Sequence, residues 1–259
     1  MSLDLFLYCI VASASAYLCV NPNVRRFVKR IARQEFRKNP NAPQINPDRL
    51  RALSLGLICC EEIGAFADSL ATGLSANRIE LELKKWGVSD KAGAIATLNW
   101  LIKSGDRASF DDILSFALKY SNKRERREAL RARYKENAPP FIDCVDRLAK
   151  AIANKRKHSV LPIGEISLKR GILAWDAGRL IALTRISYEQ GYIEEETAWA
   201  IIDNAYDATI ARYDDWREFA NGYLTGAAMA VGLARLNASY SIAKSALNGG
   251  EWSVTPLKR

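Results

Sequence analysis

Histidine is almost missing from this chain of 259 residues, which contains only His158. That residue stands beside Lys155, Arg156 and Lys157, where protonation of the imidazole is unfavourable. A Ser–His or Cys–His mechanism needs a histidine beside the nucleophile, and no such pattern surrounds His158. The sequence also lacks a glycine-rich phosphate loop, an HExxH motif and a GxSxG motif. We therefore predict no catalytic residue and leave the question of enzymatic activity open.

Cysteine occurs five times, an odd number, at Cys9, Cys19, Cys59, Cys60 and Cys144. None of these residues has the CxxC spacing, and adjacent cysteines in a helix point in different directions. A disulfide framework, a metal centre and a cofactor are therefore not expected. Asp203 and Asp207 are four residues apart and could hold a divalent cation between them. A solvated helix face is the simpler interpretation of that pair.

Proline is also scarce, with eight residues, half of them between positions 22 and 47. Long uninterrupted windows remain for helices, and hydrophobic residues make up 49% of the chain, enough for a sizeable core. We predict an all-α fold, a single multi-helix globular domain of about eight to ten helices over residues 48–250. A hydrophobic helix at residues 1–21 and a basic linker at residues 22–47 precede it, and residues 251–259 form a loose tail.

Charge is absent from residues 5–20, and a basic set follows that includes Arg25, Arg26, Lys29 and Arg30. As a helix this stretch would span about 24 Å, slightly less than a hydrocarbon core of about 30 Å. The basic residues would contact an anionic membrane surface and keep the following domain in the cytoplasm. The favoured location is the cytoplasmic face of an inner membrane. A cytoplasmic protein with this helix packed on the domain, or a cleaved signal peptide, are the alternatives.

The net charge of +9 is unevenly distributed. Residues 1–170 hold 30 basic against 18 acidic side chains, whereas residues 171–251 hold 6 against 11. Residues 122–136 are strongly charged and are interpreted as a solvated helical face, with nucleic acid or acidic lipid as the alternative partner. Only Tyr134 could stack on a base there, so nucleic acid is not the expected partner. The expected partner is a protein of unknown identity.

Residues 171–202 read as a helical hairpin around which the rest of the domain is arranged. Its first helix is apolar most of the way round, so Asp176 and Arg179 are predicted to lie in or near the core. At i,i+3 spacing their side chains meet across one turn, and a buried charge needs such a partner. Gly191 is predicted to stop this helix in the left-handed conformation.

The candidate binding site is a charge cluster made of Asp176, Arg179, Arg185, Tyr192 and Tyr223. Arg179 could bind a carboxylate or phosphate with two hydrogen bonds, which predicts an enzyme or a small-anion-binding domain. The other interpretation is a buried ion pair that fixes the register of the helix. A non-enzymatic interaction or scaffold domain is the favoured function.

Upstream, an apolar helix is predicted over residues 48–66, and two further helices are predicted from their caps and stops. Residues 76–86 form the first, which Gly87 ends, and residues 91–104 form the second, which Asp90 is placed to cap and Gly105 ends. Within and beside that helix, Trp86, Leu98 and residues 100–101 are predicted to be core.

Spaced tryptophans and glycines give the chain a signature. They occur as Trp175-Asp176-x-Gly178-Arg179, Gly191-Tyr192-Ile193, Glu196-x-Ala198-Trp199, Trp100-Leu101-x-x-x-Gly105-x-Arg107 and Trp216-x-x-Phe219-x-x-Gly222-Tyr223-x-x-Gly226. This pattern resembles the bacterial family catalogued as domain of unknown function 1266, over roughly residues 50–236. One departure is Asp106, where the resemblance implies a histidine. The resemblance implies an all-helical domain and no activity.

Overall fold

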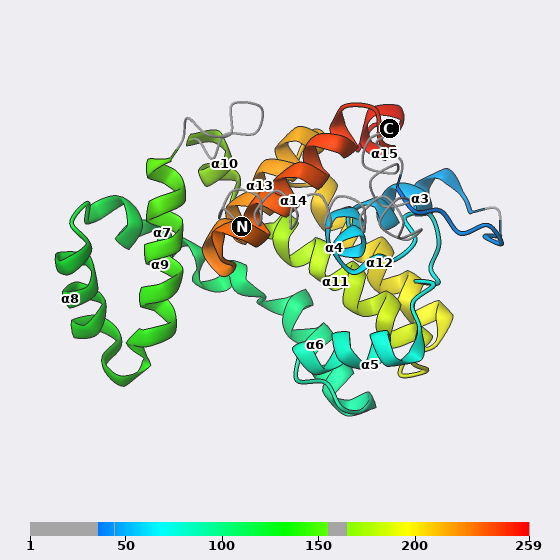
Figure 1. Ribbon diagram of the computed structural model, residues 1–259, viewed down its shortest axis with the longest axis horizontal. Helices are drawn as coiled ribbons and strands as arrows, with labels where there is room; N and C mark the ends of the chain where they lie inside the picture. The colour runs from blue at the N-terminus through cyan, green and yellow to red at the C-terminus, as the bar shows by residue number, and fades with distance from the viewer. Residues whose placement is uncertain (1–35, 44, 155–164, 259) are drawn as a thin grey trace, which may run out of the picture. The chain divides into compact units, whose positions relative to one another are not determined.

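The computed structural model describes residues 36–43, 45–154 and 165–258. Regular structure in these ranges is entirely helical, from α3 to α15 with two short 3-10 helices, and contains no strand (Figure 1). The all-α prediction is therefore confirmed for the described part of the chain. The chain divides into two units, Met1–Phe36 and Arg37–Arg259, and all these helices belong to the second. The predicted hydrophobic helix, the basic set that follows it and His158 lie outside the described residues.

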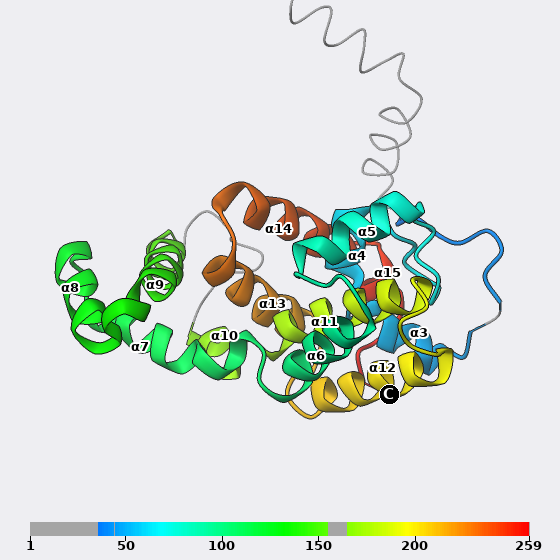
Figure 2. The same cartoon turned by 90° about the horizontal axis from the view of Figure 1, so that it is seen from below.

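Helix α11 (Leu173–Glu189) is the centre of the second unit. Five helices pack on it, as Figures 1 and 2 show: α4 (Leu57–Ile63), α5 (Ala76–Lys85), α6 (Lys91–Lys103), α12 (Glu195–Ile210) and α13 (Trp216–Ala230). Gly226 of α13 allows a close approach, since a Cβ atom there would lie 2.4 Å from the Cβ of Trp175. The predicted stop at Gly191 is confirmed by its φ of +79°.

The single helix expected near residues 48–66 is instead two helices, α3 (Pro47–Ser54) and α4, divided at Leu55 and Gly56. The chain before α3 is also held in place at Arg37. Its carbonyl accepts a hydrogen bond from Ala67 N at 2.7 Å, and its Nη1 donates to Gly64 O at 2.6 Å. The end of the predicted linker is thus part of the folded unit, because its polar groups have partners in a neighbouring loop.

The tail was predicted to be loose, and this is wrong. Helices α14 (Leu233–Leu247) and α15 (Glu251–Val254) end the chain, and Trp252 in α15 is 4% exposed. Its ring stacks on that of Trp216 with centroids 5.0 Å apart, and its Nε1 donates to Ser54 O at 3.1 Å. Burying an indole with its N–H satisfied stabilises the chain end more than the short length of the tail suggests.

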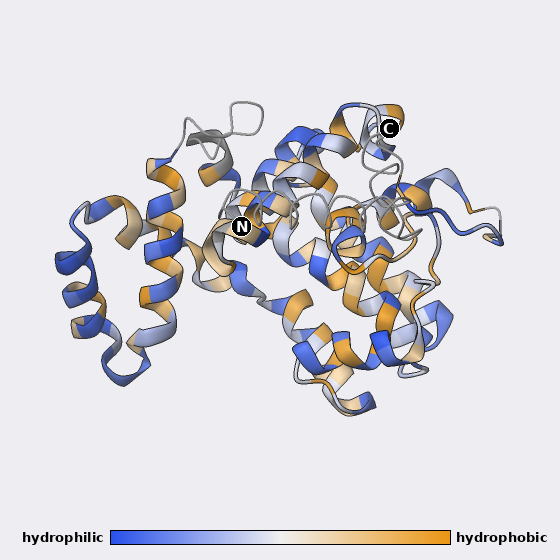
Figure 3. Cartoon of the chain, in the orientation of Figure 1, coloured by the Kyte–Doolittle hydropathy of each residue, from blue (hydrophilic) through white to orange (hydrophobic). Residues whose placement is uncertain are grey.

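Three helices, α7 (Phe110–Lys119), α8 (Lys123–Tyr134) and α9 (Ala138–Ala153), form a group in which α7 and α8 pack on α9. Helix α9 packs in turn on α13, as does α10 (Glu165–Arg170). Most of α8 is hydrophilic (Figure 3). Asp146 of α9 binds Arg126 and Arg127 of α8, with ion-pair distances of 2.7 and 2.8 Å. The ring of Tyr134 stacks on Phe141 at 4.1 Å, so one of its faces is already covered.

Helix α6 differs from its prediction on one side. Leu98 and Leu101 are 2% and 1% exposed, as predicted, but Trp100 is 40% exposed. The prediction of a buried Trp100 is wrong because it points away from the buried face of the helix. Within the described ranges, no helix is both long and apolar enough to cross a membrane.

Candidate functional site

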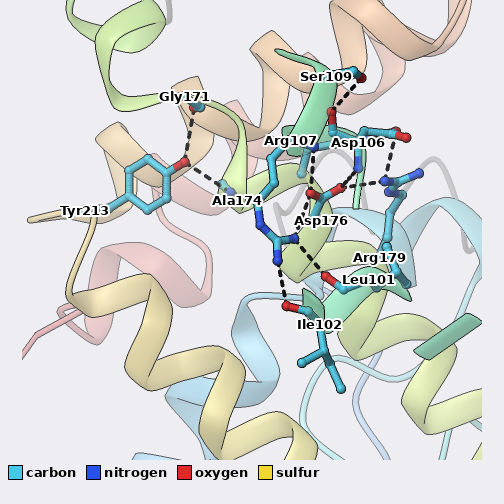
Figure 4. A network of polar contacts seen from close by, with 11 residues as sticks. Leu101, Ile102, Asp106, Arg107, Ser109, Gly171, Ala174, Asp176, Arg179 and Tyr213 are labelled. Carbon is cyan, nitrogen blue, oxygen red and sulfur yellow. Dashed lines mark hydrogen bonds and ion pairs between the residues drawn. The ribbon is translucent and has the colours of Figure 1, made fainter. Parts of the chain in front are cut away.

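Asp176 lies in the first turn of α11, with its side chain 1% exposed (Figure 4). Its Oδ1 accepts a hydrogen bond from the backbone N–H of Asp106 at 3.0 Å, and its Oδ2 accepts one from Arg107 at 3.1 Å. Both donors belong to the 3-10 helix η1 (Asp106–Ser109). The carboxylate therefore caps η1, where free N–H groups favour negative charge.

Two guanidinium groups complete the cluster. Arg107 Nη1 donates to Asp176 Oδ2 at 3.0 Å, and Arg179 Nη2 donates to Asp176 Oδ1 at 2.6 Å. The predicted contact between Asp176 and Arg179 is present. Arg179 Nη2 also lies 2.9 Å from Asp106 Oδ2. The negative charges of the two carboxylates are balanced by the positive charges of the two guanidinium groups. This pairing removes most of the cost of burying each charge.

The turn between α6 and η1 depends on Gly105, whose φ is +58° and ψ −165°. Residues other than glycine rarely adopt this backbone conformation. A Cβ atom at position 105 would also lie 2.1 Å from Asp176 Oδ2. Beside it, Arg107 donates to the carbonyls of Leu101 at 2.7 Å and Ile102 at 2.6 Å. Arg107 thus ties the last turn of α6 to the carboxylate on α11.

Indole rings surround the Arg179 guanidinium. Its Cζ lies 4.6 Å from the ring centroid of Trp175, 5.5 Å from Trp86 and 5.8 Å from Trp100. Trp175 also donates its Nε1 proton to Asp106 Oδ2 at 2.9 Å. These are cation–π contacts, in which the negative faces of the rings attract the cation. The tryptophans and the cluster therefore stabilise each other.

Arg185 is not part of this cluster, although the sequence placed it there. It is 1% exposed and donates through Nη1 to Cys60 Sγ at 2.9 Å. Its Nε donates a hydrogen bond to the carbonyl of Leu70 at 3.2 Å, and its Nη2 donates to the carbonyls of Phe66 at 2.8 Å and Ala71 at 3.0 Å. Arg185 therefore supports the loop that follows α4. Burial raises the pKa of the Cys60 thiol against the opposing effect of Arg185.

The two candidate tyrosines, Tyr192 and Tyr223, lie outside the Asp176 cluster and make separate contacts. Tyr192 donates its hydroxyl proton to Ser89 O at 3.1 Å. Tyr223 is fully buried, with its hydroxyl 3.0 Å from Cys59 Sγ and its ring edge-to-face with Trp175 at 5.1 Å. Burial raises the pKa of Tyr223 well above its usual value and that of Cys59 to about 12. Both groups stay protonated at neutral pH, so neither is an activated nucleophile or base.

The model of the family described as "Protein of unknown function (DUF1266)" matches residues 83–247. The chain belongs to the DUF1266 family. This range begins later than the resemblance predicted, and it contains the whole Asp176 cluster. No curated protein and no solved structure matches the chain. The function of this DUF1266 protein therefore has to be argued from its own geometry.

Three residues of this DUF1266 protein were missed as site members. Asp106 and Arg107 form half of the charge cluster, and the Gly-x-Arg motif was the signal that could have found them. The third is Tyr213, whose hydroxyl accepts from Ala174 N at 3.1 Å and donates to Gly171 O at 3.2 Å (Figure 4). Burial raises the pKa of Tyr213 to about 12. No local pattern marks Tyr213, because its partners are about forty residues away in the sequence.

The chemistry open to this cluster is limited. Asp176 accepts four hydrogen bonds, two on each oxygen, which is the full acceptor capacity of a carboxylate. Such a group has no lone pair free for a ligand. Asp203 and Asp207 are not part of any larger set, since the described residues contain no group of three or more His, Cys, Asp or Glu side chains that could hold a metal ion.

Proposed function

We propose that this DUF1266 protein is a non-enzymatic interaction or scaffold domain, and that the outward face of α6 is its docking surface. One observation carries the proposal. Three large apolar side chains of α6 are exposed over a large part of their surface, with Ile95 41%, Trp100 40% and Ile102 44% exposed. A helix at the surface of a folded domain normally turns polar residues outward. Several large apolar side chains exposed on one helix are instead typical of a binding site.

The helix geometry shows where these residues lie around α6. Ala94, Leu98 and Leu101 are buried and mark the inner side of α6. At about 100° per residue, Ile95 and Ile102 lie on one flank of the exposed side, and Trp100 lies on the other flank, about 140–160° around the helix. Between the flanks lie four exposed residues, Ala92, Ala96, Asn99 and Lys103. The exposed side of α6 is thus apolar on both flanks and carries Asn99 and Lys103 between them.

The Asp176 cluster supports this function by holding the docking helix. Arg107 joins the last carbonyls of α6 to Asp176, and the ring of Trp100 faces the guanidinium of Arg179. Side chains held this way lose little freedom on binding, which favours affinity. The small-anion site that remained an alternative gains no comparable support, since the polar atoms of Asp176 are already engaged.

Site-specific photo-cross-linking in cells tests the proposal. A benzophenone amino acid at position 95 should give a discrete protein adduct on irradiation. The same group at Asn237, an exposed residue of α14, is the matched control and should give none. Absence of an adduct at position 95, or equal adducts at both positions, would refute a docking role for α6.

The location at the inner membrane belongs to the same proposal and rests on the uncharged stretch at residues 5–20. Washing membranes with carbonate should leave the full chain in the pellet and release a shortened chain. The shortened chain should begin at residue 34 rather than later, because Arg37 is bonded to Gly64 and Gly73. A full chain released by the wash would exclude an integral anchor.

A further inference from the structure

We propose that the docking surface on α6 recognises an acidic side chain, aspartate or glutamate, of a partner protein, and that Arg179 and Lys103 hold its carboxylate beside Trp100. This inference rests on the proposed docking role of α6 and names the chemistry of the partner. Three features at the C-terminal end of the helix carry it: a guanidinium with unused donors, a partly exposed indole next to it, and a local excess of positive charge.

Arg179 has donors left over after its contacts within the charge cluster. A guanidinium carries five N–H groups. Both contacts with carboxylates are made by Nη2, to Asp176 Oδ1 at 2.6 Å and to Asp106 Oδ2 at 2.9 Å. Within the described part of the chain, Nε and Nη1 have no hydrogen-bond partner, and Nε is buried. Unpaired donors of a largely buried cation favour the arrival of an acceptor.

The second terminal nitrogen, Nη1, is the donor that an acceptor from outside would meet. Figure 4 shows it on the side of the guanidinium away from Asp176. The Arg179 side chain is 13% exposed, so part of it reaches the surface. A carboxylate bound at Nη1 would therefore leave the contacts with Asp176 and Asp106 in place. Recognition at this point does not require the cluster to open.

The indole of Trp100 forms the outer wall beside this guanidinium. Its ring centroid lies 5.8 Å from Arg179 Cζ, and the residue is 40% exposed. Trp86, which is half-buried, lies 5.5 Å away. Tryptophan and arginine are the residues most enriched among those that dominate the energy of protein interfaces. Rings next to a charged contact exclude water from it, and an ion pair is stronger there than in open water.

Positive charge is in excess at this end of α6. The charged side chains within the helix are Lys91 and Lys103, both basic and both exposed. Lys103 follows Trp100 by three residues and is its neighbour on the helix surface. The charge cluster itself is neutral and adjoins the last turn of α6, where Arg107 binds the carbonyl of Ile102. Lys103 thus leaves one positive charge in excess, which a single carboxylate neutralises.

A side chain carried by a protein fits this surface better than a free anion does. Nη1 and the Lys103 amine are few donors, and a contact of this size between exposed charges is weak by itself. The other flank of the exposed side carries Ile95 and Ile102, each more than 40% exposed. Only a larger partner covers both flanks. Its apolar contacts supply affinity, and the charged contact fixes its orientation and excludes wrong partners.

Charge reversal at Lys103 tests this inference in the photo-cross-linking experiment. The full chain with benzophenone at position 95 and Lys103→Glu should give at least about fivefold less adduct, because an attractive pair becomes a repulsive one. Lys103→Arg should keep the yield. Lys150→Glu, at an exposed lysine of α9, is the matched control and should also keep it. Yields are compared at equal levels of the full chain.

The outcomes separate this inference from the proposed function. A yield unchanged by Lys103→Glu would overturn the acidic partner and leave the docking role of α6 in place. The absence of any adduct from the wild-type chain would refute both. An equal loss with Lys150→Glu would also overturn the inference, since it would show an effect of net charge alone.

A second measurement identifies the acid in the purified photo-adduct. A water-soluble carbodiimide joins an amine to a carboxylate, with loss of water, only when the two groups are in contact. Mass spectrometry of the digested adduct should find Lys103 joined to an aspartate or glutamate of the captured protein, and Lys150 should show no such link. Coupling of Lys103 only to its own chain, or no coupling, would overturn the inference.

Discussion

Replacing Asp176 by asparagine is the sharpest test of how the charge cluster works. The amide retains one acceptor oxygen and presents N–H groups to donors on its other side, so about two of the four hydrogen bonds are lost. Breaking a buried ion pair costs about 3–5 kcal/mol. Arg179 and Arg107 keep other partners, and their side chains are 13% and 26% exposed. We therefore expect the lower end of the range, about 3 kcal/mol.

Urea unfolding followed by tryptophan fluorescence measures this loss. With a slope of about 2–3 kcal/mol/M, the midpoint of Asp176→Asn should fall by about 1 M or slightly more. Asp207→Asn, an exposed acid on α12, is the matched control and should change the free energy of unfolding by less than about 0.5 kcal/mol. A loss below about 1 kcal/mol for Asp176→Asn would show that the cluster does not hold α6, η1 and α11 together.

Three further changes have defined outcomes. Gly105→Ala should lower the free energy of unfolding by more than about 3 kcal/mol, because it combines backbone strain with a clash against Asp176. Gly93→Ala inside α6 should instead raise the free energy of unfolding by up to about 1 kcal/mol. Thermal unfolding of the two variants measures both changes. Trp252→Ala should cost about 3–5 kcal/mol in urea unfolding, and Trp100→Ala about 1 kcal/mol or less. Burial acts to raise the pKa of Asp146, but hydrogen bonds from two arginines outweigh it and lower that pKa below 3.8. Its contribution is thus present above pH 3.8 and is lost as the pH falls through the lowered pKa, so Asp146→Asn should cost about 2 kcal/mol at pH 7 and the difference from the wild type should shrink as the pH falls below 3.8.

Sequence periodicity predicted the helices because each buries an apolar stripe, and the same logic identified the hairpin at Gly191 correctly. It failed where a contact depends on distant parts of the chain. Trp252 looked like a loose tail residue because its partners, Trp216 and Ser54, are far away in the sequence. Trp100 looked like core because tryptophan usually is, and α6 is apolar on two sides, so periodicity could not tell its inner side from its outer one.

The candidate site was half predictable. Spacing alone paired Asp176 with Arg179, because i,i+3 neighbours on a helix meet. Arg185 is only six residues beyond Arg179, yet it points into a different part of the core and bonds to carbonyls. Asp106 and Arg107 join through their backbone N–H groups, and no residue pattern records where such donors point. Only the turn at Gly105 hinted at them.

The bond from Trp252 Nε1 to Ser54 O spans 198 residues of sequence, and it has a consequence for how the protein is made. Arg185 likewise holds carbonyls more than 110 residues before it. At a synthesis rate of about 5–20 residues per second, α3 and α4 leave the ribosome roughly 10–40 s before their last stabilising contact exists. For the first part of that interval α11 and α12, on which α4 and α3 pack, have not yet been made. The apolar surface of α3 and α4 in the nascent chain therefore stays exposed for longer than it would in a protein built from local contacts.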